Sequence, residues 1–478
     1  MSTYHLAADH APPGQLTLGL QVQLDPAGPL SSLNAGDRGG VRSGRPLGSD
    51  DVVTQYPSQA NARVVIAMIR SRTALLIAAA GLAGCADSAP KAATASASDS
   101  LGLADNILFL RPEQQVPRYR HMDQASPVRV VARGATVFPL PKSSTPLPPA
   151  GVDSFMVRNQ VAGLLILKDG KILEERYRLG NDESTKWISF SVGKSFVSTL
   201  VGAAVQDGSI ASIEDPLTKY LPALKGSAYE GVSIRQAMQM ASGVKYNEDY
   251  RDRGADIAKI TQCLHDRVPG CILDVMKALP IAGRAGTLYN YNTGETHLVG
   301  LAVQAATGKT LSDYLSEKIW KPFGMESDGS WLLESDGGQE FGGGSINATL
   351  RDYGRFGQFI LGGGNAAGQP VLPAGWIAEA SHPRDDSPAN GYGKLYPDYP
   401  LGYGYFWWSY PKGPAALPNH DGAFEGEGIF GQILYLNPAE RVVVVIWSAW
   451  PEPDVGPRWA EYRAFLGGVV GAAHGVTP

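Results

Sequence analysis

The residues best suited to chemistry in this chain are a serine and a lysine three positions apart, Ser191 and Lys194, in a Ser-x-x-Lys pattern. A hydroxyl nucleophile needs a base within hydrogen-bonding distance, and residues three apart on a helix lie on one face. If Ser191 opens a buried helix, it lies at the positive end of the helix dipole, while burial moves Lys194 toward its neutral form. The pair therefore indicates nucleophilic attack by a serine.

Only one match to this pattern is placed to hold both groups rigidly. Three other matches occur, which are Ser88/Lys91, Ser242/Lys245 and Ser409/Lys412. The first lies in an Ala/Ser-rich stretch, the second coincides with a Ser-Gly turn signal, and the third contains a proline. In contrast, Ser191–Gln206 is apolar on almost every side and ends at Asp207-Gly208, which predicts a buried central helix with a glycine cap.

The surrounding segments predict an α+β domain. Val161–Arg178 is predicted as a β-hairpin, because apolar runs flank Asp169-Gly170, a pair that favours a tight turn. Further helices are predicted at Ser233–Met240, Asp274–Leu279, Glu295–Thr307, Leu311–Trp320 and Thr349–Leu361, and further strands at Tyr403–Ser409, Ile429–Leu436 and Val442–Trp447. Strands at both ends with helices between them indicate one domain whose terminal strands share an antiparallel sheet.

Composition and motif absences exclude several other classes of protein. Hydrophobic residues make up 44% and charged residues 18%, which suits a globular core. The net charge of −5 gives no attraction for a phosphate backbone, so no nucleic-acid partner is expected. Three cysteines and eight scattered histidines form no zinc pattern, and no Gly-x-Ser-x-Gly elbow supports an α/β-hydrolase triad. His297 is predicted to be a packed structural histidine, and His420 to lie in a polar loop.

Several motifs together resemble the class C β-lactamase-like serine hydrolases. They are Ser191-x-x-Lys194, Glu214–Leu217 leading to Tyr220–Pro222, Met240–Val244 and Gly286–Gly294. Within this group, the stretches most similar to the 6-aminohexanoate-dimer (nylon-oligomer) hydrolase branch are Asn292–Glu295, Ile319–Glu326, Phe341–Gly344, Asn347–Asp352 and Gly431–Tyr435. The likeness runs from about Asn106 to Gly468. It implies a β-lactamase/penicillin-binding-protein-like fold, with an antiparallel sheet flanked by helices and a mostly helical subdomain.

The resemblance implies roles for three residues outside the central helix. Tyr291 takes the second catalytic role, in which a phenol removes the proton of the nucleophile and later delivers it to the leaving group. Tyr250 matches a tyrosine that contacts the substrate amide. Asn292 is a candidate substrate-binding residue, although the family's Tyr-x-Asn order is altered here.

The segment Ala423–Ile429, implied to be a strand that lines the site, departs from the family in charge, since it lacks Lys-Thr-Gly. Gly426, Glu427 and Gly428 are its candidate substrate-binding residues, and glycines let a backbone N–H approach an oxyanion. A substrate carboxylate about 4 Å from Glu427 would be disfavoured by roughly 4 kcal/mol at an effective dielectric constant near 20. We therefore expect β-lactam and D-Ala-D-Ala substrates to be disfavoured, unless Glu425 and Glu427 point to solvent.

The first hundred residues are predicted to lie outside the folded domain. Residues 1–67 are rich in Gly, Pro, Ser and Asp, which indicates a disordered or untranslated leader. Residues 68–85 join a basic stretch to a short apolar run ending at Cys85, as in a bacterial lipoprotein signal peptide; a buried alanine-rich helix is the alternative. Residues 86–105 are predicted to be a flexible tether, and residues 106–470 the hydrolase domain.

Export follows from that interpretation. A lipid on Cys85 would hold the protein at the periplasmic face of a membrane, and Ala86 after the cysteine favours the outer membrane. An oxidising compartment allows a disulfide between Cys263 and Cys271 across Pro269-Gly270, with two free thiols as the alternative.

These interpretations together predict an exported lipoprotein serine hydrolase that cleaves a small-molecule amide or ester through an acyl-enzyme. Linear amides with a free amine, such as 6-aminohexanoate oligomers, suit both the family branch and the acidic strand. A short-chain carboxylesterase is the first alternative, followed by a β-lactamase or D,D-peptidase and by a non-catalytic envelope binding protein. No metal or organic cofactor is expected, the lipid anchor is the only membrane contact expected, and the sequence leaves the oligomeric state open.

Overall fold

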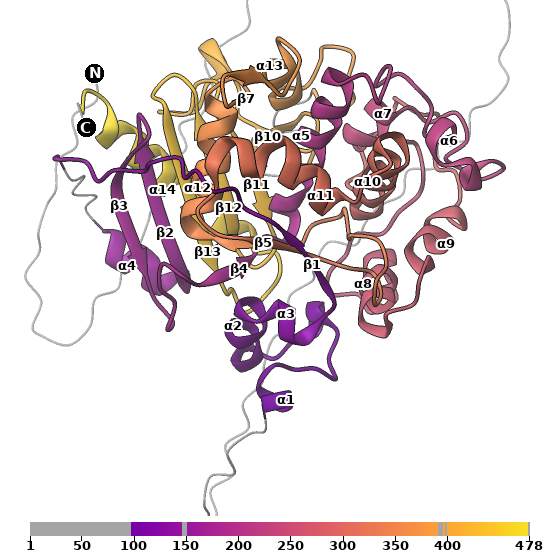
Figure 1. The fold of residues 1–478 in the computed structure, drawn as a ribbon, viewed down its shortest axis with the longest axis horizontal. Helices are drawn as coiled ribbons and strands as arrows, with labels where there is room; N and C mark the ends of the chain where they lie inside the picture. The colour runs from indigo at the N-terminus through magenta and orange to yellow at the C-terminus, as the bar shows by residue number, and fades with distance from the viewer. Residues whose placement is uncertain (1–96, 146–150, 391–394, 397–398, 477–478) are drawn as a thin grey trace, which may run out of the picture. The chain divides into compact units, whose positions relative to one another are not determined.

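The structure is a computed structural model that describes residues 97–145, 151–390, 395–396 and 399–476 (Figure 1). The predicted leader (1–67), the predicted signal peptide (68–85) with Cys85, and residues 86–96 of the predicted tether lie outside the described residues. Within the described ranges, no helix combines the length and the apolar character that crossing a bilayer requires.

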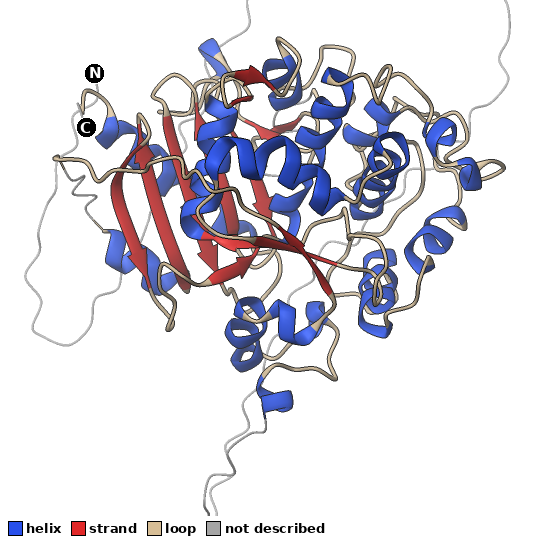
Figure 2. Ribbon diagram, viewed as in Figure 1, coloured by secondary structure: helices blue, strands red, loops and turns tan. Residues whose placement is uncertain are grey.

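The core of the described chain is an antiparallel sheet built from both ends of the domain (Figure 2). Its seven strands in the described ranges, in spatial order, are β3 (Lys171–Tyr177), β2 (Val161–Lys168), β13 (Val442–Ser448), β12 (Gln432–Asn437), β11 (Phe424–Gly428), β10 (Trp408–Ser409) and β9 (Gly402–Tyr403). β2 pairs with β13 from Lys168 opposite Val442 to Gly163 opposite Trp447. The predicted α+β fold, with its terminal strands in one antiparallel sheet, is therefore confirmed.

The hairpin and the central strands follow from local sequence. Asp169 and Gly170 join β2 to β3 with φ angles of 50° and 75°, which suit the tight turn predicted there. β13 begins with four valines, whose branched side chains favour extended backbone. Every residue of β2 and β13 is buried, so both faces of the sheet must be covered.

Helices cover the two faces of this sheet (Figure 1). α12 (Leu350–Leu361) lies close against one face, because a Cβ at Gly357 would be only 2.6 Å from Val443 Cγ1. α14 (Gly456–Ala473) and α4 (Val152–Arg158) cover the other face, where the rings of Phe155 and Phe465 stack with centroids 3.9 Å apart. Glycine in α12 thus permits the close packing that shields the central strands.

The other helices gather mainly beside the central helix, as the predicted helical subdomain. The central helix is α5 (Gly193–Gln206), and beside it lie α6 (Leu217–Tyr220), α7 (Ile234–Met238), α8 (Asp256–Asp266), α9 (Cys271–Lys277), α10 (Thr293–Thr307) and α11 (Leu311–Leu315). The remaining helices are α1 (Ala97–Ser100), α2 (Pro112–Arg120), α3 (Met122–Ala125) and α13 (Trp376–Ser381). Short 3₁₀ turns are η1 (Ile107–Phe109), η2 (Phe190–Val192), η3 (Pro222–Leu224) and η5 (Gly413–Ala415), and η4 (Ser316–Gly324) is a π-helix. Central α5 is buried from Gly193 to Ala204, as predicted.

A second sheet supports the start of the central helix. It comprises β1 (Val128–Val131), β5 (Gly329–Leu332), β6 (Ile346–Thr349) and β4 (Lys186–Ile188), and a separate short hairpin is β7 (Asn365–Ala366) with β8 (Gln369–Pro370). β4 pairs with β6 up to Ile188 opposite Asn347. The chain then turns through η2 directly into α5, so this sheet fixes where the helix begins.

Two predicted strands differ in extent from the observed ones. The predicted strand Tyr403–Ser409 is split into β9 and β10, which pair with each other around Phe406, whose φ is 60°. The predicted strand Ile429–Leu436 starts late, as β12, because Phe430 and Gly431 turn the chain with φ angles of 62° and 86°. Side-chain pattern alone does not reveal such turns at apolar residues.

The end of one helix and the start of the folded domain also differ from expectation. The predicted helix Leu311–Trp320 passes from α11 into the π-helix η4, which contains Pro322, a residue without an N–H to donate. Residues 97–105 of the predicted tether are folded: Leu101 is buried, and Arg118 Nη1 donates to its carbonyl at 3.2 Å. The predicted boundary at residue 106 is wrong because this buried guanidinium needs acceptors from the preceding segment.

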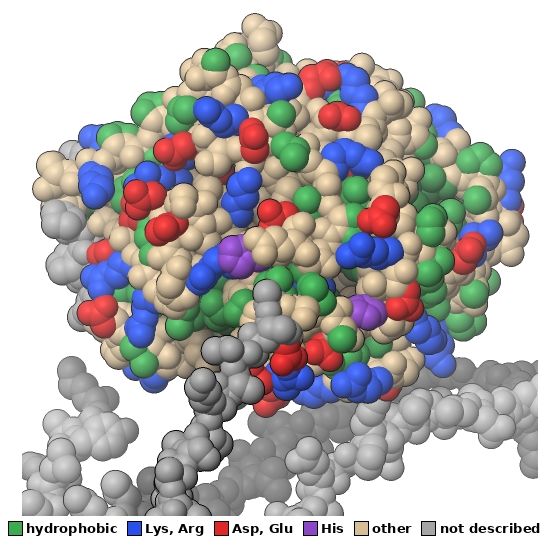
Figure 3. Space-filling view, turned by 60° about the horizontal axis from the view of Figure 1, so that its bottom comes forward, with side chains coloured by type: hydrophobic (Ala, Val, Ile, Leu, Met, Phe, Trp, Pro, Cys, Tyr) green, Lys and Arg blue, Asp and Glu red, His purple; other side chains and the backbone are tan. Residues whose placement is uncertain are grey.

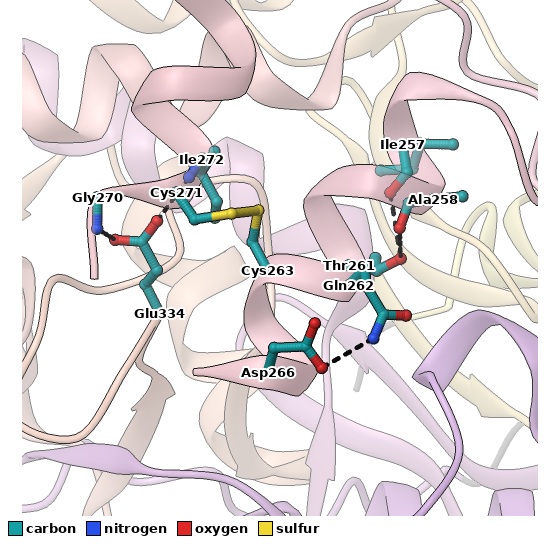
Figure 4. Close-up of a disulfide and its surroundings, with 10 residues drawn as sticks. All are labelled: Ile257, Ala258, Thr261, Gln262, Cys263, Asp266, Gly270, Cys271, Ile272 and Glu334. Atoms are coloured by element: carbon teal, nitrogen blue, oxygen red, sulfur yellow. Dashed lines mark hydrogen bonds between the residues drawn. A yellow bond between two sulfur atoms is a disulfide. The ribbon is translucent and has the colours of Figure 1, made fainter. Parts of the chain in front are cut away.

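Cys263 and Cys271 form a disulfide that links α8 to α9 (Figure 4). The same connection is held by Glu334, whose carboxylate accepts hydrogen bonds from the N–H groups of Gly270 (2.9 Å) and Ile272 (2.8 Å). The structure thereby selects the paired cysteines over the two free thiols.

The surface near α2 and α3 carries charges of both signs. On the face that Figure 3 shows, Lys and Arg side chains are interspersed with Asp and Glu. This mixture agrees with the small net charge of −5.

Candidate active site

Ser191 lies at the junction between the small sheet and the central helix. It is the middle residue of η2, and the preceding Phe190 has a φ of 43°, a left-handed conformation that costs on the order of 1–3 kcal/mol. The Phe190 ring packs against Tyr119 and Phe430, with centroids 5.0 and 5.3 Å away. Packing thus holds a strained turn and fixes the position of the hydroxyl.

Lys194 lies one helical turn further on and is 1% exposed. Its Nζ donates to Ser191 Oγ at 2.7 Å and to the carbonyl oxygen of Gly343 at 2.8 Å. Burial lowers the pKa of Lys194 to about 7, and the negative charge of Glu248 opposes this shift. Near neutral pH a large fraction of Lys194 is therefore an uncharged amine, which can accept the Ser191 proton.

The glycines before β6 make the Lys194 contact with a carbonyl possible. A Cβ at Gly342 would lie 2.8 Å from the carbonyl oxygen of Thr296, and one at Gly343 would lie 2.7 Å from Thr293 Cγ2. Only a segment without side chains can therefore run this close to α10.

Tyr291 comes from the loop before α10 and is 8% exposed. Its hydroxyl is hydrogen-bonded to Ser191, and Lys194 Nζ lies 5.2 Å from the centroid of its ring. Burial raises the pKa of Tyr291 well above its ordinary value of 10, and the charge of Glu248 raises it further, while the bond to Ser191 acts in the opposite direction. Tyr291 is therefore a neutral phenol at neutral pH, suited to relaying a proton rather than to acting as a phenolate.

Ser191 and Tyr291 open onto a cavity of about 490 Å³. Its aromatic lining comprises Tyr250, Tyr291, Tyr396, Tyr399, Trp408 and Trp459, and its acidic lining comprises Glu248, Asp249, Glu427 and Asp454. Among the described lining residues Arg251 is the sole basic side chain, and it already donates to Glu452 at 2.8 Å. The cavity is consequently aromatic and acidic.

Glu248 is a site residue that sequence reasoning missed. Its carboxylate accepts hydrogen bonds from the Thr293 N–H (3.0 Å), the Thr293 hydroxyl and the Tyr250 hydroxyl (2.8 Å). Burial raises the pKa of Glu248, and the charge of Lys194 lowers it. Its sequence signal was its position two residues before Tyr250, which lines the cavity.

Strand β11 presents its glycines and its glutamates to opposite faces of the sheet. A Cβ at Gly428 would lie 2.6 Å from the Ser189 carbonyl oxygen, and one at Gly426 would lie 3.0 Å from Ser195 Oγ. Gly428 lines the cavity, but Gly426 does not. The prediction that Gly426 binds substrate is therefore wrong, because this residue packs against the side of α5.

Glu425 and Glu427 are buried, with 1% and 9% exposure, so the alternative that both point to solvent is wrong. Glu427 lines the cavity and accepts a hydrogen bond from the Tyr399 hydroxyl. Glu425 accepts one from the Tyr410 hydroxyl at 3.1 Å. The acidic charge of this strand thus lies inside the protein, beside the cavity.

Asn292, which directly follows Tyr291, has its side chain directed away from the cavity. It is fully buried as the N-cap of α10, where its Oδ1 accepts the Glu295 N–H at 3.2 Å. Its Nδ2 donates to the Tyr229 hydroxyl and to Glu295 Oε1, both at 3.2 Å. The prediction that Asn292 binds substrate is therefore wrong, since both polar atoms of its buried side chain are already bonded to Glu295 and Tyr229.

The two histidines considered from sequence are structural. His297 accepts the Gly342 N–H at 3.3 Å in a buried helix, as predicted. His420 lies in the loop before β11, where its ring is buried and contacts the Tyr435 hydroxyl (2.9 Å) and the Arg463 carbonyl (3.0 Å). Burial lowers the pKa of both imidazoles to about 4. Within the described ranges, no three His, Cys, Asp or Glu side chains group as metal ligands.

The chain is similar in sequence and in fold to several known proteins. The family model described as Beta-lactamase matches residues 152–467. The 6-aminohexanoate-dimer hydrolase of Paenarthrobacter ureafaciens is 30% identical over 344 residues, covering 70% of this chain and 81% of that protein. A solved structure from Bacillus anthracis, named as a candidate 6-aminohexanoate-dimer hydrolase, has a TM-score of 0.66 at 22% identity and covers 76% of this chain and 96% of its own. An octameric penicillin-binding protein homologue from Pyrococcus abyssi has a TM-score of 0.51 at 16% identity, covering 66% and 75%.

Proposed function

Because this chain belongs to the beta-lactamase family, we propose that it is a serine hydrolase that cleaves an amide or ester through an acyl-enzyme on Ser191. The observation that carries the proposal is the 2.7 Å contact between Lys194 Nζ and Ser191 Oγ, beside the Tyr291 hydroxyl and at an open cavity. Acyl transfer needs this combination of nucleophile, base and proton carrier.

In the acylation step, neutral Lys194 accepts the Ser191 proton as Oγ bonds to the substrate carbonyl carbon. The carbonyl oxygen becomes an oxyanion, for which the N–H groups of Ser191 and Ile429 are the proposed donors, since both residues line the cavity. The proton then passes from Lys194 through the Tyr291 hydroxyl to the leaving amine or alcohol. The C–N or C–O bond breaks and Ser191 carries the acyl group.

Deacylation repeats these transfers with water as the nucleophile. The water gives its proton to Lys194 through the Tyr291 hydroxyl and attacks the ester carbonyl of the acylated Ser191. The Ser191 oxygen leaves and takes the proton back, which releases the carboxylic acid. The raised pKa of Tyr291 supports this relay, because it keeps the phenol protonated between transfers.

We favour linear amides related to 6-aminohexanoate oligomers as the substrates. The Paenarthrobacter ureafaciens relative is named as the hydrolase of such a dimer, and the chains share most of their length. A cavity of about 490 Å³ falls in the range that holds small extended molecules. Esters of short acids need the same residues, so a short-chain carboxylesterase is the alternative that the substrate panel must test.

Chemical labelling tests the proposal directly. A fluorophosphonate probe should label the wild-type protein and not S191A, whereas a non-catalytic binding protein would leave both unlabelled. A panel of amine-bearing linear amides, p-nitrophenyl butyrate and a chromogenic cephalosporin then ranks the substrates. Faster hydrolysis of the cephalosporin than of every amide would contradict the preference for linear amides.

We also propose that the protein is an exported lipoprotein anchored through Cys85. The support is the basic stretch and short apolar run of residues 68–85, which end at that cysteine. Mass spectrometry of the mature protein should find a diacylglyceryl cysteine at the N-terminus. An unmodified N-terminus before Cys85 would contradict this proposal.

A further inference from the structure

Two carboxyl groups on β11, of which Glu427 lines the cavity and Glu425 lies behind it, play no part in the acyl-transfer steps. Glu425 and Glu427 are two positions apart on β11, so they point to the same face of the sheet. Both are buried, and among the described residues neither has a Lys, Arg or His nitrogen within 4 Å. Buried carboxylates are normally paired with cations, so this pair needs a separate explanation.

The two carboxyls titrate as an interacting pair with raised pKa values. Burial raises the pKa of Glu425 well above its ordinary value, and the charge of Glu427 raises it further. Burial also raises the pKa of Glu427, which a hydrogen bond from Glu425 and one from Tyr399 partly offset. Interacting carboxyls lose their protons in two separate steps, so the pair holds a single negative charge over the interval between them.

Arg463, on α14, favours the ionised form of this pair but forms no ion pair with either glutamate in the described part of the chain. Its guanidinium lies 4.8 Å from the centroid of the Tyr399 ring and forms no ion pair with Glu425 or Glu427 among the described residues. Its positive charge lowers the pKa of both glutamates and so favours their ionised forms. Glu427 lines the cavity, and its Oε1 accepts the Tyr399 hydroxyl there.

Aromatic rings stand around Glu427 on the cavity side. The rings of Tyr399 and Trp408 lie 5.0 Å apart at 70°, and Tyr396 lies 6.4 Å from each of them. The rings of Tyr399 and Trp408 pack edge to face and form an aromatic wall of the cavity. The faces of Trp and Tyr attract cations, as the Arg463 guanidinium near the Tyr399 ring illustrates. A carboxylate with such walls is the chemistry that recognises an ammonium group.

The remaining lining also favours a cation over an anion. Glu248, Asp249 and Asp454 add further carboxyl groups to the same cavity. Arg251 is engaged with Glu452, and no other basic side chain is found in the described lining. A substrate carboxylate would therefore meet repulsion without a matching cation.

We propose that Glu427, together with the rings of Tyr399 and Trp408, forms a subsite that binds a primary alkylammonium group of the substrate. This inference rests on the proposed function, because the substrate must reach Ser191 from the same cavity. Glu427 and the two rings determine specificity here, whereas Ser191, Lys194 and Tyr291 carry out the bond cleavage. Glu425 is a positioning residue that shares the charge of Glu427 through their hydrogen bond.

The test compares n-hexylammonium chloride with 1-hexanol as competitive inhibitors of p-nitrophenyl butyrate hydrolysis. The two compounds have nearly the same size and differ in charge. We expect the ammonium compound to inhibit the wild-type protein at a concentration at least about tenfold lower than the concentration of 1-hexanol that gives the same inhibition. E427Q should remove most of that preference, while D249N, which neutralises an exposed carboxylate of the same lining, should change it less than about threefold. Equal inhibition by both compounds in the wild type, or an unchanged preference in E427Q, would overturn the proposal.

A second measurement separates this subsite from the catalytic proposal. Calorimetric titration of S191A with n-hexylammonium chloride and with 1-hexanol requires no turnover and no Glu427 variant. Tighter binding of the ammonium compound supports the subsite even if the wild type fails to hydrolyse the ester. Equal or absent binding of both compounds refutes the subsite, and fluorophosphonate labelling still decides on Ser191.

Discussion

Replacing Glu248 with glutamine tests whether neutral Lys194 is the base that activates Ser191. Burial lowers the pKa of Lys194 to about 7, and the negative charge of Glu248 holds it from falling further. Removing that charge destabilises the ammonium form, so the pKa of Lys194 should fall. Activity that requires the neutral amine should then persist to lower pH in E248Q.

Glutamine can keep the hydrogen bonds that Glu248 makes. Its amide oxygen can accept the Thr293 N–H, and its amide nitrogen can donate to the Thr293 and Tyr250 hydroxyls, which rotate to accept. The substitution therefore changes the charge and leaves the packing intact.

The expected shift follows from the size of the charge interaction. An opposite charge within about 4–6 Å moves a pKa by about 1–3 units. We take the lower end, because Glu248 forms no ion pair with Lys194 within 4 Å among the described residues and the pKa of Glu248 is itself raised. The pKa of Lys194 should thus drop from about 7 to roughly 6. At pH 6 the neutral fraction would rise from about one tenth to about one half, a fivefold gain relative to the plateau.

The assay is kcat/KM for p-nitrophenyl butyrate between pH 4.5 and 9, which reports groups of the free enzyme. D249N is the matched control: Asp249 is exposed in the same lining, and its solvent-screened charge should move the acidic midpoint by less than about 0.3 units. An acidic midpoint that stays in place or moves upward in E248Q would refute the assignment of Lys194 as the base.

Four further changes have defined outcomes. S191A should lower kcat at least about 1,000-fold with an unchanged circular dichroism spectrum. If S191A turned over substrate at the wild-type rate, Ser191 would not be the nucleophile. Y291F loses the proton relay and should lower kcat/KM about 100-fold or more, so a loss under threefold would contradict the relay. C263A/C271A should lower the free energy of unfolding by about 2–3 kcal/mol in denaturant titrations, and no change would refute a stabilising disulfide. G428A forces a Cβ to 2.6 Å from a carbonyl oxygen and should cost about 1–3 kcal/mol of stability by the same measurement, whereas wild-type stability would contradict the close packing.

The parts of the site that sequence could predict are those set by local periodicity. Three residues span about one helical turn, so Ser191 and Lys194 had to share a face once Ser191–Gln206 was recognised as a helix. The alternation of side chains along a strand likewise put Glu425 and Glu427 together and Gly426 and Gly428 together. The remaining motifs were found by resemblance, which supplied Tyr291 and Tyr250.

Which side of an element faces the cavity depended on long-range packing. Asn292 follows Tyr291 directly, yet its side chain turns inward to cap α10, because a helix start leaves N–H groups that need acceptors. Gly426 and Glu427 are neighbours, but α5 covers one and the cavity meets the other. Glu248 had no motif of its own and became visible only through its contacts with Thr293 and the charge of Lys194.

The sequence by itself therefore indicated the candidate nucleophile with its candidate base, the central hairpin and the buried helix, because each depends on residues a few positions apart. The tertiary structure alone decided that Glu425 and Glu427 are buried beside aromatic rings, and that Glu248 lies close enough to influence Lys194. Burial and electrostatic coupling arise from elements far apart in the chain, and they set the protonation states on which the proposed chemistry depends.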